Sequence, residues 1–142
     1  MARGVGFSLA VAAGFCAAMA SVFSKLAFEE EGATLKHITC PFVAESVCPS
    51  VVLALRVGSF ILLFLSNAVM WALFVRALQG CGSTVEAAVA NSGSNFIFTA
   101  LFGIFLFGES VSLMWWFGAS LVVLGLVVIQ HGVRDPESDK KL

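Results

Sequence analysis

The sequence predicts an all-α membrane protein whose four helices each cross the bilayer. The chain has 142 residues, of which 59% are hydrophobic and only 12% are charged, whereas soluble domains are about half apolar and a quarter charged. A chain this short leaves a large share of its surface exposed, so in water it could not bury so much apolar surface. The charged residues are also widely spaced, which leaves four uncharged windows close to the ~20 residues that a spanning helix needs.

These windows set the expected helix boundaries. No charged residue lies between Arg3 and Lys25, and the later windows are 57–75, 87–108 and 110–130. The predicted transmembrane helices are residues 5–28, 53–75, 85–107 and 113–131. Together they form one domain, residues 1–131, with a loop at 29–50 and a solvated polar tail at 132–142. The very short connection between the last two helices predicts an antiparallel hairpin.

The first window has a second interpretation. Arg3 precedes an apolar run, and Ala18-Met19-Ala20 resembles the cleavage site of a secretory signal peptide. The run is longer than such peptides usually have, and it continues from Val22 to Phe28 beyond that site. We therefore favour a transmembrane helix and keep a cleaved signal peptide as the alternative.

The basic residues predict the orientation, because Lys and Arg favour the cytoplasmic side of a membrane. One side of the predicted topology holds Arg3, Arg76, Arg134, Lys140 and Lys141, and the other holds Lys25, Lys36 and Arg56. Both termini are thus expected in the cytoplasm, with the protein in an endomembrane or the plasma membrane. The difference between the two sides is small and leaves a dual orientation open.

The cysteines and the remaining polar residues narrow the function classes. Cys40 and Cys48 share the loop opposite the termini, where an oxidising compartment would allow a disulfide, and two free thiols are the alternative. No Cys/His spacing matches a metal site, and no catalytic constellation is present, so we expect no metal, no cofactor and no enzymatic activity. No Lys/Arg cluster follows a phosphate backbone, so we expect no nucleic-acid binding.

A polar stripe marks the third predicted helix. Asn91, Asn95 and Thr99 are four residues apart and share one helix face. Buried amides are costly without partners, so this face is expected to meet the bundle interior or a wet cavity. Asn67 and Trp71, four apart on the second helix, are expected to face the same interior. The group predicts either a path for a small polar solute or interhelical hydrogen bonds without a ligand.

Small residues predict close helix packing. Gly14 and Ala18 share a narrow face of the first helix with Ala10, Ala17 and Ser21, and this face is expected either to pack closely on another helix or to line a groove. Gly118 and Gly125 lie on one face of the last helix. That face could contact a second protomer or the third helix, and the sequence leaves both open.

Several segments resemble a known family. Ser24 to Phe28 ends the first helix, Met70-Trp71 lies in the second, Gly108-Glu109 forms the last turn, and Gly118 and Gly125-Leu126 lie in the last helix. In this order they resemble the transmembrane protein 42 family and, more broadly, the EamA-like half-domain of the drug/metabolite transporter superfamily. The resemblance implies a four-helix bundle of that kind.

The layout is also similar to that of the small multidrug resistance proteins, which work as dimers. Lys25 ends the first helix and Ser92-Gly93 interrupts the third, as in that group. Those exporters carry a glutamate in the first helix about two turns before the lysine, where this chain has Cys16-Ala17-Ala18. The resemblance therefore does not extend to proton-coupled export through that carboxylate.

Two hypotheses follow. The first is a transporter-like subunit for a small solute of unknown identity, embedded in the lipid bilayer and acting as a homodimer or heterodimer. The second is a non-transporting membrane adaptor or assembly factor that holds a partner through the Gly118 and Gly125 face or through the loop.

Overall fold

The computed structural model describes residues 3–29, 33–44, 46–108, 110 and 112–134. Within these ranges the chain forms helices and connecting turns and no strand, so the predicted all-α class is confirmed. The elements are α1 (Arg3–Phe28), α2 (Ala33–Thr39), the 3₁₀ turn η2 (Cys40–Phe42), α3 (Cys48–Gly80), α4 (Thr84–Phe107) and α5 (Leu113–Arg134). Most of the predicted polar tail, residues 135–142, lies outside the described residues, as does Glu109 of the last turn.

Three helices in the described part of the chain are long and apolar enough to cross a membrane. They are Gly4–Phe28, Cys48–Gly80 and Thr84–Phe107. The apolar stretch of α5, Leu113–Ile129, is shorter. The lengths and composition of these helices support an integral, multi-pass membrane protein, and the fourth crossing stays a prediction.

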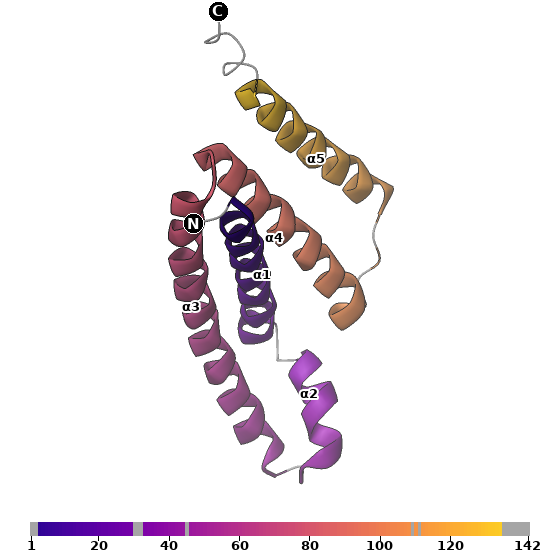
Figure 1. The fold of residues 1–142 in the computed structure, drawn as a ribbon. Coiled ribbons are helices and arrows are strands. Elements are labelled where there is room, and N and C mark those ends of the chain that lie inside the picture. Colours follow the sequence, from indigo (N-terminus) through magenta and orange to yellow (C-terminus); the bar gives the residue numbers. More distant parts are fainter. Residues whose placement is uncertain (1–2, 30–32, 45, 109, 111, 135–142) are drawn as a thin grey trace, which may run out of the picture.

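Helix α1 lies between α3 and α4, which diverge from the turn that joins them (Figure 1). Small residues make this arrangement close-packed. Ala10 of α1, Ala77 of α3 and Ala87 of α4 are each fully buried and form one cluster. Because lipid is as apolar as a leucine side chain, close backbone approach through small residues is what holds such helices together.

Helix α3 is longer than predicted at both ends. It begins at Cys48 instead of residue 53, ends at Gly80 instead of residue 75, and contains 33 residues. At ~1.5 Å per residue its length is about 50 Å, well above the ~30 Å of the hydrocarbon core. Pro49 falls in its first turn, where the missing amide hydrogen costs nothing. The proline was expected in a loop, and instead it starts a helix.

The predicted loop 29–50 is also largely helical, which corrects the expectation of an irregular connection. Leu35 of α2 packs with Cys48 and Val52 of α3 in a second buried cluster. The carboxylate of Glu29 accepts hydrogen bonds from the Thr34 amide at 2.9 Å and from the Thr34 hydroxyl at 2.7 Å. These bonds fix the start of α2 against the end of α1.

A disulfide closes this region at the start of α3. Cys40 of η2 is bonded to Cys48 of α3, with the two Cα atoms 5.4 Å apart. Cys16 and Cys81 are free thiols. The disulfide therefore joins the end of the α2 segment to the first residue of the long helix.

The remaining helices are bounded by ordinary caps. The Ser83 hydroxyl accepts a hydrogen bond from the Val85 amide at 3.1 Å and begins α4, and Gly108 ends it in the left-handed conformation with φ 60°.

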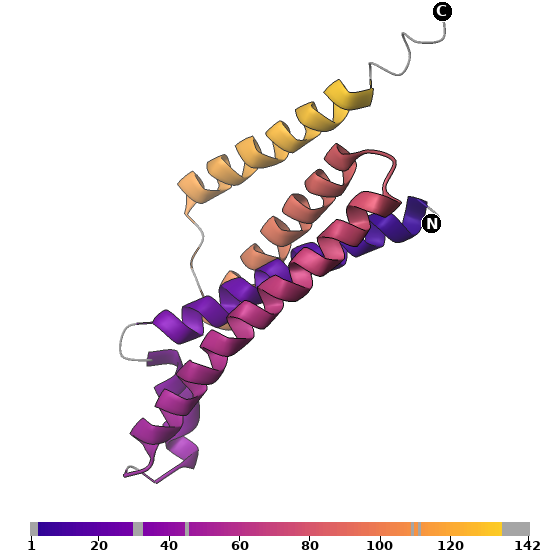
Figure 2. The same ribbon diagram turned by 90° about the vertical axis from the view of Figure 1, so that its left-hand side faces the viewer.

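Helix α5 runs back alongside α4 and stands apart from α1 and α3 (Figure 2). Its contact with α4 includes the stacked rings of Phe96 and Trp115, whose centroids are 5.8 Å apart.

Candidate functional site

The close approach of α1 and α4 at Gly14 sets the geometry of the bundle interior. A Cβ atom built on Gly14 would lie 2.5 Å from the carbonyl oxygen of Asn91 and 2.8 Å from the amide nitrogen of Asn95. Real Cβ atoms are essentially never closer than 3.0 Å to such atoms. Only glycine permits this spacing, and Ala18, one turn further along α1, is fully buried as well.

A polar depression that is largely open to the surroundings lies next to this contact, and we call it the polar groove. It has a volume of about 580 Å³ and is bounded by all three packed helices. Its walls are Ala17, Ala20, Ser21, Ser24 and Lys25 of α1, Leu63, Asn67 and Met70 of α3, and Asn95 of α4. All of these positions fall within the three candidate membrane spans, where polar side chains are costly unless they meet one another or water.

The two asparagines of the polar groove each form a hydrogen bond within their own helix. Asn67 donates through Nδ2 to the Leu63 carbonyl at 3.0 Å, and the Asn95 Oδ1 accepts from the Thr99 hydroxyl at 3.2 Å. An amide side chain offers two donor hydrogens and an acceptor oxygen. Each therefore has one of these groups bonded within its own helix, and each side chain lines the groove.

Lys25 lies at one end of the polar groove. Its ammonium nitrogen lies 4.0 Å from the centroid of the Phe107 ring on α4, a cation–π distance. Arg56 of α3 lies close to the same end of α1 and donates from Nε to the Ala27 carbonyl at 3.1 Å and from Nη2 to the Glu29 carbonyl at 3.0 Å. These carbonyls have no partner within the helix, so Arg56 caps α1.

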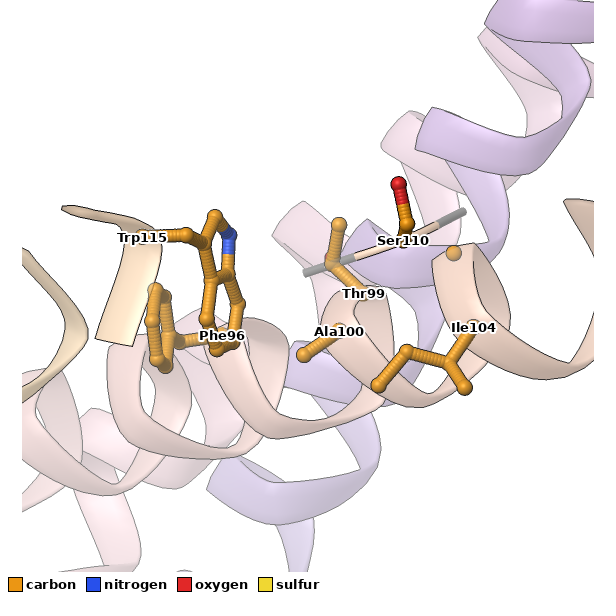
Figure 3. A pocket seen from close by; sticks show the side chains of 7 residues that line it. Phe96, Thr99, Ala100, Ile104, Ser110 and Trp115 are labelled. Carbon is orange, nitrogen blue, oxygen red and sulfur yellow. The ribbon is translucent and has the colours of Figure 1, made fainter. Parts of the chain in front are cut away.

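Smaller cavities adjoin the groove along α4. One of about 180 Å³ is lined by Ser21, Lys25, Thr99 and Phe107, among others. Another of about 190 Å³ lies between α4 and the start of α5, where Thr99 and Phe96 face Trp115 and Ser110 (Figure 3). Thr99 borders both cavities, so the polar stripe of α4 runs past the groove toward α5.

The predicted site residues divide into those that the structure brings together and those that it separates. Asn67 and Asn95 share the polar groove, and Thr99 is hydrogen-bonded to Asn95. Asn91 lies instead at the Gly14 contact, and its Oδ1 is buried without a hydrogen-bond partner in the described part of the chain. Trp71 is 60% exposed and packs edge-on against Phe74, away from the groove.

The glycines of α5 face open space. No heavy atom lies within 4 Å of a Cβ built on Gly118 or Gly125. The contact between α4 and α5 runs instead through Gly93, whose added Cβ would lie 3.8 Å from Leu126. Of the two alternatives for this face, packing against α4 is therefore not observed within the described chain.

The sequence predicts only part of the contribution of α1 to the polar groove. The small-residue face that includes Ser21 predicts either helix packing or the lining of a groove, whereas Ser24 and Lys25 stand out only through the family resemblance and the charge at the helix end. A helical projection would have placed Ser21 and Lys25 on one face, since they are four residues apart. Only the packing of α1 between α3 and α4 shows that this face meets the two asparagines.

Comparison with known proteins gives no assignment for this chain. No protein-family model matches it, and no solved structure matches it. The functional argument therefore rests on the geometry of the polar groove and on the sequence resemblance.

Proposed function

We propose that this chain is a transporter-like subunit of the drug/metabolite transporter type that carries a small polar or amphipathic solute across its membrane. The observation that supports this most is the polar groove. Asn67, Asn95 and two serines come from three different helices and line one groove within the candidate membrane spans. Solute sites of membrane transporters are formed by polar groups between packed spanning helices, which is why this groove supports the proposal.

The proposal includes a dimer, because one copy supplies only part of a transport pathway. Alternating access requires two units that move against each other around the site. Helix α5 has its glycine face open, and most of its large apolar residues are exposed, among them Leu121, Leu124 and Val128. A second copy, or a related chain, packing on this helix would supply the missing unit.

The proposed subunit differs from the proton-coupled multidrug exporters that its layout resembles. Among the described residues that line the polar groove none is a carboxylate. The wall where those exporters have a glutamate is formed here by Ala17 and its neighbours on α1. The proposed transport therefore does not depend on a carboxylate in the groove as a proton carrier.

The open face of α5 also supports a second candidate, a membrane adaptor. Gly118 and Gly125 are seven residues apart on one helix face, and the structure places nothing against them. A spanning helix of another protein could pack closely there through the two glycines. In that case the polar groove would be a dry set of interhelical contacts.

Water access to the groove separates the two candidates. In a protein with Cys16 and Cys81 replaced by alanine, we would introduce Asn95→Cys or Asn67→Cys and apply a membrane-impermeant maleimide to both faces of proteoliposomes. The matched control is Phe64→Cys, because Phe64 follows Leu63 of the groove wall on α3, does not line the groove, and is 61% exposed.

The transporter proposal predicts that the thiols at positions 67 and 95 react and that the thiol at position 64 does not, because a maleimide requires an aqueous path. Equal, negligible labelling at all three positions would overturn the proposal and favour the adaptor.

A further inference from the structure

We propose that the polar groove takes up the headgroup of a membrane phospholipid, which enters sideways from the leaflet next to α2. The inference rests on the proposed function and adds the class of the solute, an amphipathic lipid whose acyl chains stay in the bilayer. It comes from the depth of the groove, the direction in which it opens and the apolar side chains beside it.

The polar groove reaches from the middle of the spanning region to one edge of it. Its inner end is at Ala17, Leu63 and Asn95, each of which lies within one residue of the midpoint of its candidate span. Its other end is at Lys25, in the last turn of α1. The eight positions that separate Ala17 from Lys25 correspond to ~12 Å of helix, close to half of the ~30 Å hydrocarbon core. The groove therefore extends through one leaflet, the one next to α2, which follows the end of α1.

The half of the bundle toward the opposite leaflet is closed. Ala10, Ala77 and Ala87, one from each of the three packed helices, form a fully buried cluster. Nearer the start of α1, a Cβ built on Gly6 would overlap the backbone of Gly80 at the end of α3. A solute therefore reaches the groove from the leaflet next to α2 and not from the other.

The groove opens sideways. Helices α3 and α4 diverge from the turn that joins them, and α1, which lies between them, supplies most of the lining residues (Figure 1). In the described part of the chain no residue of α5 lines the groove, and the groove is left largely open. Polar groups in hydrocarbon are costly without partners, because no water is present there to bond them. A polar groove that opens sideways within a leaflet therefore suits a polar group that a lipid carries.

Exposed aromatic side chains beside the groove suit the acyl chains of such a lipid. Phe64 follows Leu63 of the groove wall on α3, and its ring lies 5.0 Å from that of Phe60, measured between centroids. The Phe60 ring in turn lies 5.8 Å from that of Phe28 at the end of α1. All three rings are exposed. A lipid whose headgroup lies in the groove can keep its acyl chains along these rings, in the hydrocarbon of the bilayer.

The test uses the unsubstituted protein in nanodiscs of phosphatidylcholine that contain a photoreactive analogue. One analogue carries a phenyldiazirine on its headgroup and the other carries it at the end of an acyl chain. After irradiation the adducts are assigned to residues by mass spectrometry. The groove positions are Ser21, Asn67 and Asn95. The matched controls are Leu65 and Val69, because they lie two residues to either side of Asn67 on α3, are about half exposed and do not line the groove.

The proposal predicts that the headgroup probe labels Ser21, Asn67 and Asn95 and leaves Leu65 and Val69 unlabelled. An ordinary headgroup stays at the interface, ~15 Å from the middle of the hydrocarbon core, so it reaches this depth only through the groove. The acyl probe should label Leu65 and Val69, which shows that these residues can react. This comparison needs no substitution and does not depend on how a variant folds.

A pair of variants tests the role of the groove amides. Asn67→Leu keeps the approximate size of the side chain and removes its amide, so headgroup labelling of Ser21 and Asn95 should fall. Leu65→Ala, on the same helix outside the groove, should leave that labelling unchanged. Equal labelling in the two variants would argue against binding of the headgroup by the groove.

The contrary outcomes separate this inference from the proposed function. If the headgroup probe labels no groove position while the maleimide reacts with Asn67→Cys and Asn95→Cys, the solute enters from water, and the lipid inference fails while the transporter proposal stands. Headgroup labelling that is equal at groove and control positions would also overturn the inference, because it would not depend on the groove. If neither the headgroup probe nor the maleimide reaches the groove, the groove is dry, and both proposals fail.

Discussion

Gly14 of α1 lies so close to the Asn91 carbonyl of α4 that a residue with a side chain would not fit at this position. A Cβ at Gly14 would be 2.5 Å from that oxygen and 2.8 Å from the Asn95 amide nitrogen. The Ser94 hydroxyl lies closer still, and because the other two crowding atoms belong to the backbone of α4, a side chain at this position would have to push the helix away. This contact fixes the distance between α1 and α4 beside the polar groove, and it therefore controls the shape of the groove.

Replacing Gly14 should destabilise the bundle more than replacing a glycine in open space. Gly14→Val forces α1 and α4 apart, and we expect a loss of about 1–3 kcal/mol of unfolding free energy, the usual cost of overpacking. Gly58→Val is the matched control, because a Cβ on Gly58 meets nothing within 4 Å. The measurement is reversible unfolding in mixed detergent micelles. Equal losses in the two variants would show that this contact does not constrain the bundle.

Arg56 should stabilise the end of α1. Its guanidinium donates to the carbonyls of Ala27 and Glu29 across the helix interface. Hydrogen bonds from a charged group contribute about 1.5–3 kcal/mol. We expect Arg56→Met to lower the unfolding free energy by that amount and to increase amide hydrogen exchange in the last turn of α1. Arg76→Met, which removes an exposed arginine from the same helix, serves as the control, and an effect as large as that of Arg56→Met would argue against the capping role.

The Cys40–Cys48 disulfide predicts a specific thiol count. The structure leaves Cys16 and Cys81 as free thiols. Protein purified from membranes, denatured and treated with a maleimide polymer should gain two polymer chains, and four after reduction. Reduction should also lower stability by roughly 2–3 kcal/mol, because the bridge closes a short loop in the unfolded chain. If four polymer chains attach without reduction, the loop lies in a reducing compartment. That result would contradict a Cys40–Cys48 disulfide in the cell.

The stability of the junction between α1 and α2 should depend on pH through Glu29. The hydrogen bonds from the Thr34 hydroxyl and amide hold the pKa of Glu29 below its ordinary value. Because the pKa is lower in the folded state, the ionised carboxylate stabilises the fold fully above the ordinary value of about 4.3, and this contribution disappears as the pH falls through the lowered value.

Thr34→Val removes the hydrogen bond from the Thr34 hydroxyl, which lowers the pKa of Glu29 most. The substitution should therefore raise this pKa toward its ordinary value. The check is a titration of the Glu29 side-chain carbon by nuclear magnetic resonance in micelles. Identical titration midpoints in the parent and in Thr34→Val would rule out Thr34 as the cause.

The helices could be predicted from the sequence because charged residues are costly inside a bilayer, so that uncharged windows mark the helices. The uncharged windows that follow Arg3, Arg56 and Glu86 each correspond to part of an observed helix. The ends were less predictable. Pro49 indicated a loop, but a proline is equally compatible with a first helical turn, and the burial of Val52 against Leu35 decides between them. Such a tertiary contact leaves no local signal in the sequence.

For the same reason, only part of the candidate site could be predicted from the sequence. Asn95 and Asn67 stood out because an amide in an apolar helix is unusual, and both line the polar groove. In the sequence Lys25 stands out only as a basic residue at the end of the first predicted helix, where it enters the predicted orientation and the family resemblance. Its contact with Phe107, from a helix about 80 residues later in the chain, depends on how α1 packs and not on any pattern within α1.

The central claim is that one copy of this chain supplies a groove but not a complete transport pathway. The most direct test is native mass spectrometry of the protein released from lipid nanodiscs, with Gly118→Leu as a variant that fills the open face of α5. We expect either a homodimer or a heterodimer with a related chain. We also expect a clear loss of that dimer in Gly118→Leu. A protein that is monomeric in lipid and carries no second chain would contradict it, since a single groove with no second unit cannot alternate between the two sides of a membrane.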